Sequence, residues 1–182
     1  GRTCLDAGAS TGGFTDVLLR RGAKLVVAVD VGYGQLAWEL RQDARVKILD
    51  RTNIRHLTGD MVGEEIDLVV ADLSFISLSL VLPALAAVSK SDADFVLMVK
   101  PQFEVGREKL GAGGVVRDPA LRRAAVLDVA ESAYDVGLGT MGIAASPLPG
   151  PAGNVEYFLW LRRGAPAIDG FAVDKAIQEG PA

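Results

Sequence analysis

Three polar residues, a lysine and two acids, stand beside apolar runs where they could act on one substrate. Asp72 follows the run ending at Ala71, Lys100 follows the run ending at Val99, and Glu156 lies near the start of the last predicted strand. If that strand is antiparallel, the three side chains should converge at one sheet edge. A lysine that loses its proton in a desolvated site can accept the proton of a hydroxyl. We predict Asp72, Lys100 and Glu156 as catalytic residues that deprotonate an alcohol.

The plainer alternatives are a surface lysine at the start of a loop for Lys100 and an ordinary strand-end acid for Glu156. Against the first, a lysine directly between an apolar strand and a proline is unusual for a solvated position. The prediction therefore depends on the three residues acting together.

A glycine-rich segment, LDAGASTGGF at residues 5–14, lies between the first predicted strand and the first predicted helix. Such a turn lets backbone approach a ligand closely. Gly8 and Gly13 fit the dinucleotide fingerprint, but Ser10 stands where its middle glycine would be. Asp6 would repel a pyrophosphate and suits a ligand with a cationic amino-acid end. S-adenosylmethionine, which carries an ammonium and a sulfonium, is therefore the predicted cofactor.

Two further acids end the next strands, where Asp30 could bind ribose hydroxyls and Asp50 could lie at the height of an adenine edge. The alternative is that the glycines only turn the chain and the acids only cap helices. Three acidic strand ends in order after such a loop favour the cofactor site. The predicted cofactor-binding residues are Asp6, Gly8, Ser10, Gly12, Gly13, Phe14, Asp30, Val31, Asp50, Arg51 and Asp72.

The elements that must position these residues alternate along the chain. Short apolar runs, typical of strands buried on both faces, are Arg2–Asp6, Leu25–Asp30, Val46–Leu49, Ile66–Ala71 and Asp94–Val99. Helical segments are Gly13–Arg21, Gln35–Gln42, Leu78–Val88 and Pro119–Tyr134, the last with Asp118 as N-cap. Two successive strands, Gly139–Ala145 and Val155–Leu161, should be antiparallel neighbours, and Phe171–Glu179 is a possible short helix. The pattern predicts a doubly wound α/β sheet.

The composition excludes several classes of protein. With 182 residues, 49% hydrophobic and 23% charged, the chain suits one globular domain. A single cysteine and a single histidine exclude an internal disulfide and leave almost no zinc ligands, so we expect no metal. No apolar run approaches the ~18 residues of a membrane helix, and no signal peptide opens the chain.

The net charge of −4 argues against a self-sufficient nucleic-acid binder. One stretch differs: six basic residues stand against three acids between Lys100 and Arg123, with Gly111, Gly113 and Gly114 among them. This stretch could be a mobile lip over the substrate, or simply a solvated loop and helix face.

Four motifs carry a family resemblance: DAGASTGGF from Asp6, DLSFISL from Asp72, VKPQFE from Val99 and GNVEYFLWL from Gly153. Together they resemble the TlyA family of rRNA methyltransferases, within the FtsJ-like 2′-O-ribose methyltransferase superfamily. The resemblance implies a Rossmann-like methyltransferase fold with strand order 3-2-1-4-5-7-6 and an antiparallel seventh strand. It also implies methyl transfer from S-adenosylmethionine to cytidine 2′-hydroxyls in the rRNA of both subunits, by a cytoplasmic monomer that binds ribosomal subunits.

The superfamily uses a Lys-Asp-Lys-Glu tetrad, and Asp72, Lys100 and Glu156 match its last three members. Its first lysine belongs upstream of the glycine loop, where this sequence has none. The resemblance implies a methyltransferase domain at residues 1–163, a tail at 164–182, and a family N-terminal RNA-binding domain that is absent here. We therefore expect cofactor binding with poor methyl transfer.

Two rival functions stay open. The family also carries a haemolysin name, which implies a membrane-active protein, although we expect no stable membrane insertion. A non-catalytic module that only binds S-adenosylmethionine is the other rival, for which replacing Asp72 or Lys100 with alanine would change nothing.

Overall fold

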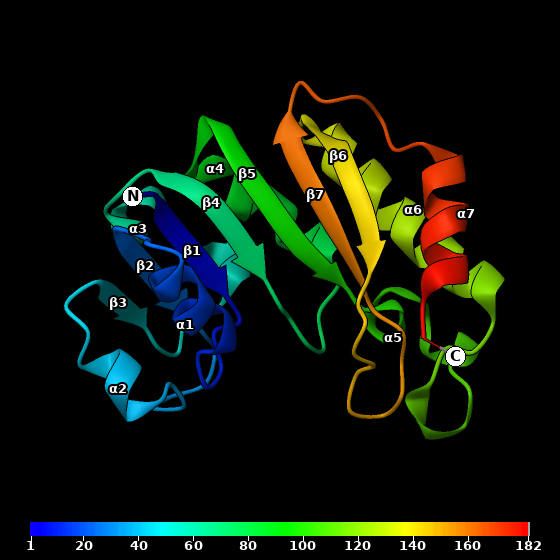
Figure 1. Ribbon diagram of the computed structural model, residues 1–182, viewed down its shortest axis with the longest axis horizontal. Helices are drawn as coiled ribbons and strands as arrows, with labels where there is room; N and C mark the ends of the chain where they lie inside the picture. Colours follow the sequence, from blue (N-terminus) through cyan, green and yellow to red (C-terminus); the bar gives the residue numbers. More distant parts are fainter. Residues whose placement is uncertain (182) are drawn as a thin grey trace. The chain divides into compact units, whose positions relative to one another are not determined.

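Seven strands of the described chain form one sheet in the order β3-β2-β1-β4-β5-β7-β6 (Figure 1). The computed structural model describes residues 1–181, with the backbone alone at residue 107. The strands are β1 Thr3–Ala7, β2 Leu25–Val29, β3 Val46–Leu49, β4 Ile66–Ala71, β5 Ser89–Val99, β6 Leu138–Ala145 and β7 Tyr157–Arg163. This order is the predicted one and is confirmed. The antiparallel pairing of β7 with β6 confirms the predicted antiparallel seventh strand.

Helices follow each of these strands except β6. The α-helices are α1 Gly13–Arg20, α2 Trp38–Arg41, α3 Gly59–Val62, α4 Leu82–Ala87, α5 Pro101–Glu104, α6 Pro119–Asp135 and α7 Gly170–Glu179. Short 3₁₀ helices are η1 Ile54–His56, η2 Leu78–Leu80, η3 Arg107–Lys109 and η4 Ala112–Gly114. No helix among residues 1–181 is both long and apolar enough to span a membrane.

The chain divides into two compact units. The first comprises Gly1–Leu73 and Val81–Val96. In it, β1 pairs in parallel with both β2 and β4, and all five β1 residues are buried. A strand with neighbours on both sides is buried on both faces, which explains the apolar Cys4, Leu5 and Ala7 around Asp6. Helix α1 covers this strand with Leu18 and Leu19, which pack with Cys4.

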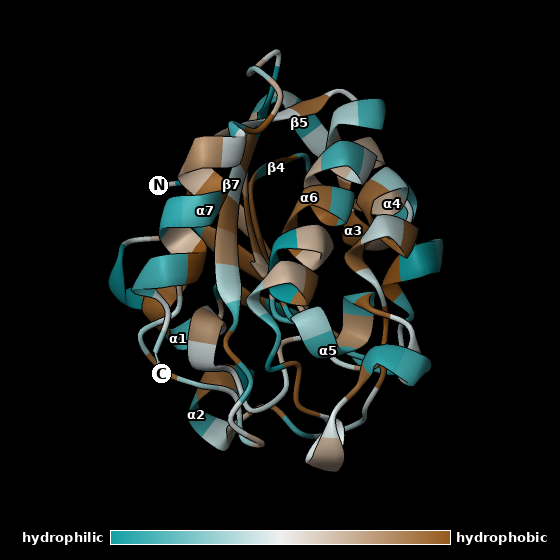
Figure 2. Cartoon of the chain, turned by 90° about the vertical axis from the view of Figure 1, so that its right-hand side faces the viewer, coloured by the Kyte–Doolittle hydropathy of each residue, from teal (hydrophilic) through white to brown (hydrophobic). Residues whose placement is uncertain are grey.

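The second unit comprises Ser74–Leu80 and Leu97–Ala182. Its β6 and β7 run antiparallel from Ala145 opposite Tyr157 to Leu138 opposite Arg163. Helix α6 packs on β6 and on α7, and it carries both hydrophobic and hydrophilic residues, coloured brown and teal in Figure 2. The Arg123 guanidinium on α6 also pairs with Asp174 on α7 at 2.5 Å, so the predicted tail helix is part of this unit.

The structure moves several predicted boundaries. The predicted helix over residues 78–88 is split into η2 and α4, because Pro83 lies in the first turn of α4 and lacks the N–H that would continue a helix from η2. The predicted helix over residues 35–42 keeps only α2. Strand β5 begins earlier, at Ser89, and β7 begins at Tyr157, so Glu156 directly precedes this strand instead of lying within it.

Candidate active site

The glycine loop after β1 is folded by left-handed residues and by hydrogen bonds to the end of β2. The N–H groups of Gly8 and Ala9 both donate to the carbonyl of Val29, at 2.8 and 3.1 Å. Gly8 has φ +85°, and a Cβ there would lie 2.4 Å from the carbonyl oxygen of Asp72. Glycine is therefore required at position 8 by both backbone conformation and space.

Asp6 lies within β1, and its side chain is closed to solvent in this structure. The residue is 0% exposed, and its Oδ2 accepts a hydrogen bond of 2.7 Å from the hydroxyl of Thr15. Its Oδ1 is buried without a hydrogen-bond partner among the described residues. Burial raises the pKa of Asp6 to about 6, and the hydrogen bonds from Thr15 act against that rise. The predicted contact of Asp6 with a cationic ligand stays a prediction.

Asp30 ties the glycine loop to the loop that follows β2. Its Oδ2 accepts from the N–H of Ser10 at 2.9 Å, and its Oδ1 accepts from the N–H of Gly32 at 2.7 Å. Ser10 itself is left-handed, with φ +48°. Since a carboxylate oxygen can accept two hydrogen bonds, Asp30 retains capacity toward a ligand after organising both loops.

Asp50 and Arg51 directly follow β3, beside that second loop. The Asp50 carboxylate accepts from the N–H of Gly34 at 3.2 Å and pairs with Arg41 at 3.3 Å. The Arg51 guanidinium lies 4.4 Å from the ring centroid of Tyr33, a cation–π arrangement. Tyr33 was not predicted from the sequence, because its only signal is its place in the loop opposite a strand-end arginine.

Four other predicted cofactor residues lie in the first unit. Val31 is 69% exposed and is open to contact. Gly12 is the left-handed N-cap of α1, and Gly13 begins that helix with open space where a Cβ would lie. Phe14 instead packs against the core cluster of Cys4 and Leu18. A ligand contact of Phe14 stays a prediction.

Lys100 lies in the second unit, immediately after β5 and at the N-cap of α5. Its Nζ lies 3.4 Å from the Oγ of Ser74, which belongs to the DLSFISL segment. The same segment bears Phe75, which has φ +64° and is 90% exposed, with its ring centroid 5.0 Å from that of Phe103. A side chain so exposed in a strained backbone conformation is available for contact with a ligand.

Glu104 joins the DLSFISL and VKPQFE segments. Its Oε2 accepts from the hydroxyl of Ser77 at 2.5 Å, and its Oε1 accepts from the N–H of Leu78 at 2.9 Å. Burial raises the pKa of this carboxyl, and the two donors oppose the rise. Glu104 is not predicted from the sequence, because nothing in the spacing of the two motifs shows that they meet.

Glu156, also in the second unit, is 6% exposed. Its Oε1 accepts a hydrogen bond of 3.0 Å from the Nε2 of Gln102. A Cβ on Gly150 would lie 2.8 Å from the same oxygen, so the backbone of Gly150 packs against it. The acid is therefore held in a closed environment rather than on an exposed strand end.

Asp72 follows β4 at the end of the first unit, and its N–H donates to the carbonyl of Ala7 at 3.0 Å. The structure thus brings Asp72 beside the glycine loop, and it brings Lys100 and Glu156 into the second unit. The convergence of all three predicted catalytic residues stays a prediction.

The predicted glycine-containing lip is anchored by Asn154. The Oδ1 of Asn154 accepts from the N–H of Val116 at 2.9 Å, and its Nδ2 donates to the carbonyl of Gly114 at 3.1 Å. Asn154 is 3% exposed and stands two residues before Glu156. The lip is therefore attached to the segment that carries the predicted catalytic acid.

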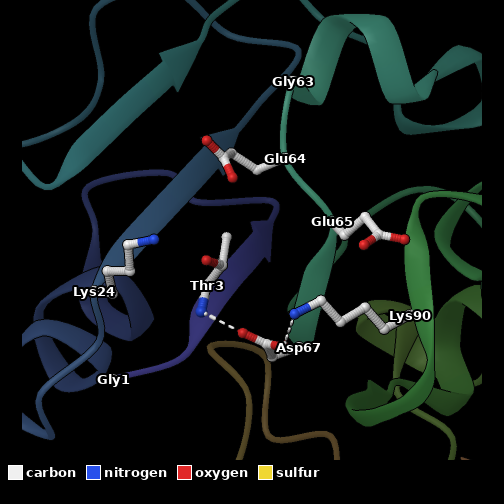
Figure 3. A pocket seen from close by; sticks show the side chains of 8 residues that line it. All are labelled: Gly1, Thr3, Lys24, Gly63, Glu64, Glu65, Asp67 and Lys90. Carbon is white, nitrogen blue, oxygen red and sulfur yellow. Dashed lines mark hydrogen bonds and ion pairs between the residues drawn. The ribbon is translucent and has the colours of Figure 1, made fainter.

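A hollow of about 390 Å³ in the first unit lies at the opposite strand ends, where β1 and β4 begin (Figure 3). Asp67 in this hollow accepts from the N–H of Thr3 at 2.8 Å and pairs with Lys90 at 2.7 Å. The hollow is separate from the glycine loop, and the charges of Asp67 and Lys90 within it are paired with each other. Within residues 1–181, no group of three or more His, Cys, Asp or Glu side chains could hold a metal ion.

The strand order, the glycine loop after β1 and the acids at the next strand ends define the class: this is a Rossmann-like methyltransferase fold. The model of the FtsJ-like methyltransferase family matches residues 1–163. The chain belongs to this family.

Three known proteins show how close the similarity is. The chain is 62% identical over 187 aligned positions to the 16S/23S rRNA (cytidine-2′-O)-methyltransferase TlyA of Mycobacterium tuberculosis, covering 100% of this chain and 69% of that protein. A solved Lactococcus lactis structure that carries a hemolysin name has a TM-score of 0.91 at 39% identity, covering 98% of this chain and 87% of the other. A Burkholderia thailandensis N1-methyltransferase with bound S-adenosylhomocysteine has a TM-score of 0.62 at 19% identity, covering 89% of this chain and 71% of the other. The last likeness concerns the fold alone.

Proposed function

We propose that this chain transfers a methyl group from S-adenosylmethionine to the 2′-hydroxyl of cytidines in the rRNA of both ribosomal subunits. The observation that carries the proposal is the 62% identity, over the whole chain, to a relative named for that reaction. The chemistry of the second unit supports the proposal, because Lys100 and the buried acid Glu156 both lie in that unit.

The residues of the first unit fit S-adenosylmethionine. The buried Oδ1 of Asp6 is an acceptor without a partner among the described residues, beside a loop whose Gly8 leaves room for close backbone approach. Asp30 and Asp50 keep acceptor capacity for hydroxyl and amino groups. When bound, the cofactor supplies an electrophilic methyl group on a sulfonium, so the reaction requires no metal.

The residues of the second unit would prepare the nucleophile. We propose that Lys100 accepts the proton of the 2′-hydroxyl as its oxygen attacks the methyl carbon, and that Glu156 and Asp72 orient the reacting groups. Ser74, 3.4 Å from the Lys100 Nζ, would restrict the position of the amine. We propose that residues 1–163 form the methyltransferase domain and that residues 164–182 are its tail.

RNA would be contacted by aromatic and basic groups of the second unit. The exposed Phe75 ring, supported by Phe103, is suitable for stacking on an unpaired base. Among the basic residues of the lip, Arg122 donates to the carbonyl of Val116 and Arg123 pairs with Asp174, whereas Lys109 is exposed. Part of the positive charge of the lip is thus engaged in contacts within the fold. We propose that rRNA binding requires positive charge outside this chain. A ribosomal substrate implies a cytoplasmic location, and we propose a monomer.

The test combines cofactor binding with methyl transfer. We expect the chain to bind S-adenosylmethionine in calorimetry, with Asp30→Ala weakening binding, and to transfer radiolabelled methyl groups slowly to 16S and 23S rRNA. Mass spectrometry of digested rRNA should identify 2′-O-methylcytidine. Lys100→Met should abolish transfer and preserve cofactor binding, whereas Lys90→Met, at a partly exposed ion pair, should change neither. Methylation of a base nitrogen or carbon would contradict the proposal.

A second candidate function is lysis of membranes, which the hemolysin name of the Lactococcus lactis structure favours. The Lys100→Met protein separates the two candidates. Erythrocyte lysis that persists in this variant while rRNA methylation disappears would show that two separable activities exist. Absence of lysis by the wild-type chain would leave methyl transfer as its function.

A further inference from the structure

We infer that Gln102 is a positioning residue for Glu156, which it holds in one orientation by a hydrogen bond from its side-chain amide. The inference rests on the proposed function, in which Glu156 is one of the residues that orient the reacting groups. Gln102 is the second residue of α5 and stands two positions after Lys100.

The contact between the two side chains joins segments that are far apart in the chain. The Nε2 of Gln102 donates to the Oε1 of Glu156 over 3.0 Å, across 54 positions of sequence. Among the described residues, this is the one hydrogen bond that the Glu156 side chain accepts. A carboxylate acceptor also determines which end of the amide faces it, because the opposite orientation would place two acceptor oxygens together.

That orientation leaves the other end of the amide unsatisfied. The Oε1 of Gln102 is buried without a hydrogen-bond partner among residues 1–181. A buried acceptor without a donor costs stability, and such groups in native proteins are few and frequently functional. The cost is understandable if the contact with Glu156 serves the reaction rather than the fold.

The rest of the Glu156 environment leaves its side-chain position to Gln102. The Glu156 carbonyl accepts from the N–H of Ser146 at 2.8 Å, which ties its backbone to the end of β6. Gly150 closes one side of the Oε1 with backbone, where a Cβ would lie 2.8 Å away. The main chain and one side of the carboxylate are therefore bounded, and the hydrogen bond from Gln102 selects the orientation.

The same short helix connects Gln102 to the predicted base. Lys100 is the N-cap of α5, and Gln102 is the second residue of that helix. The helix therefore fixes the positions of their backbones relative to each other. A shift of α5 would consequently move the Lys100 backbone and the Glu156 partner together. We expect Gln102 to affect the rate of methyl transfer within the enzyme–RNA complex rather than the formation of that complex.

Kinetics in two backgrounds test the inference. Gln102→Met, which keeps side-chain length and removes the amide, should lower kcat for rRNA methylation at least tenfold, with the KM for RNA changed less than twofold. In the Glu156→Ala background, the same substitution should lower kcat less than twofold further, because a residue that acts through Glu156 has nothing left to position. Gln102→Asn, one methylene too short, should behave as Gln102→Met. Equal fold-reductions in both backgrounds, or an unchanged kcat in the first, would overturn the inference.

Two controls separate folding and the proposed function from the inference. Gln178→Met, at an exposed position of α7, should leave kcat unchanged, and thermal unfolding should show that the Gln102 variants are folded. If the wild-type chain transfers no methyl group, the proposed function fails. NMR then decides the inference, since the side-chain amide protons of Gln102 should exchange faster in Glu156→Ala than in the wild type. Equal exchange would refute the hydrogen bond.

Discussion

The hydroxyl of Thr15 donates a hydrogen bond to the carboxylate of Asp6 at 2.7 Å, and both residues are 0% exposed. This pair connects α1 to β1 directly beneath the glycine loop. Burial raises the pKa of Asp6 to about 6, and the donors on Thr15 limit that rise. The charge of the acid beside the proposed cofactor site thus depends on a neighbouring hydroxyl.

Replacing Thr15 with valine should weaken binding of S-adenosylmethionine at neutral pH by at least tenfold. Without the hydroxyl the pKa of Asp6 rises further, so more of the carboxyl is protonated when a cationic ligand arrives. Calorimetric titrations at pH 7 and pH 8.5 check this, because the defect should shrink at the higher pH. Thr140→Val, on β6 in the other unit, is the matched control. Equal affinity in the Thr15 variant and the wild type at both pH values would contradict the prediction.

Asp6 should make the fold less stable as the pH rises. Its folded-state pKa of about 6 lies above the ordinary value of 3.8, so the protonated form is favoured by folding. The stabilisation is complete below about pH 4 and is lost as the pH rises to about 6, a change of about 3 kcal/mol. Urea unfolding from pH 4 to 7 should therefore show Asp6→Asn gaining stability relative to the wild type by roughly that amount. Parallel curves for the two proteins would show that Asp6 does not titrate abnormally.

Gly8→Ala should destabilise the fold by about 2 kcal/mol or more and abolish cofactor binding. The new Cβ would meet the Asp72 carbonyl at 2.4 Å in a backbone conformation with φ +85°. Gly59→Ala is the matched control, since nothing lies within 4 Å of its Cβ and alanine favours the helix that begins there. Chemical denaturation and calorimetry measure the two effects. Similar losses in both variants would mean that local crowding at Gly8 is not the cause.

Asn154→Ala should release the lip from the segment that bears Glu156. The substitution removes the acceptor of the Val116 N–H and the donor to the Gly114 carbonyl, at a local cost of about 1–3 kcal/mol. Hydrogen exchange should show faster exchange of the Val116 amide, whereas the amides of β1 should stay protected. Asn53→Ala, which removes the acceptor for the Arg55 N–H in η1, should leave the Val116 amide unchanged. Unchanged protection of Val116 in Asn154→Ala would refute the anchoring role.

The sequence was most informative where an apolar run stops at a polar residue. Val46–Leu49 and Ile66–Ala71 were predicted with the bounds that the structure shows, because strands of a parallel sheet are rich in Val, Ile and Leu. The order of the seven strands followed from the family resemblance rather than from any pattern of residues.

The partners of polar side chains could not be predicted in this way. Gln102 and Glu156 are separated by 54 positions, and Glu104 meets Ser77 across 27, so their contacts depend on how loops between distant elements close. The burial of Asp6 required knowing that α1 presents Thr15 toward β1. Glu156 was expected inside the last strand, whereas β7 begins one residue after it, at Tyr157.

The two compact units are not consecutive in the chain: the backbone passes between them after Leu73, after Leu80 and after Val96, the last within β5. No single cut, by protease or by gene truncation, can therefore release either unit intact. In a split version of this protein, divided for complementation between two plasmids, at least one half would therefore carry pieces of both units. Inheritance of the complete first unit without any part of the second would likewise require three breakpoints in the gene.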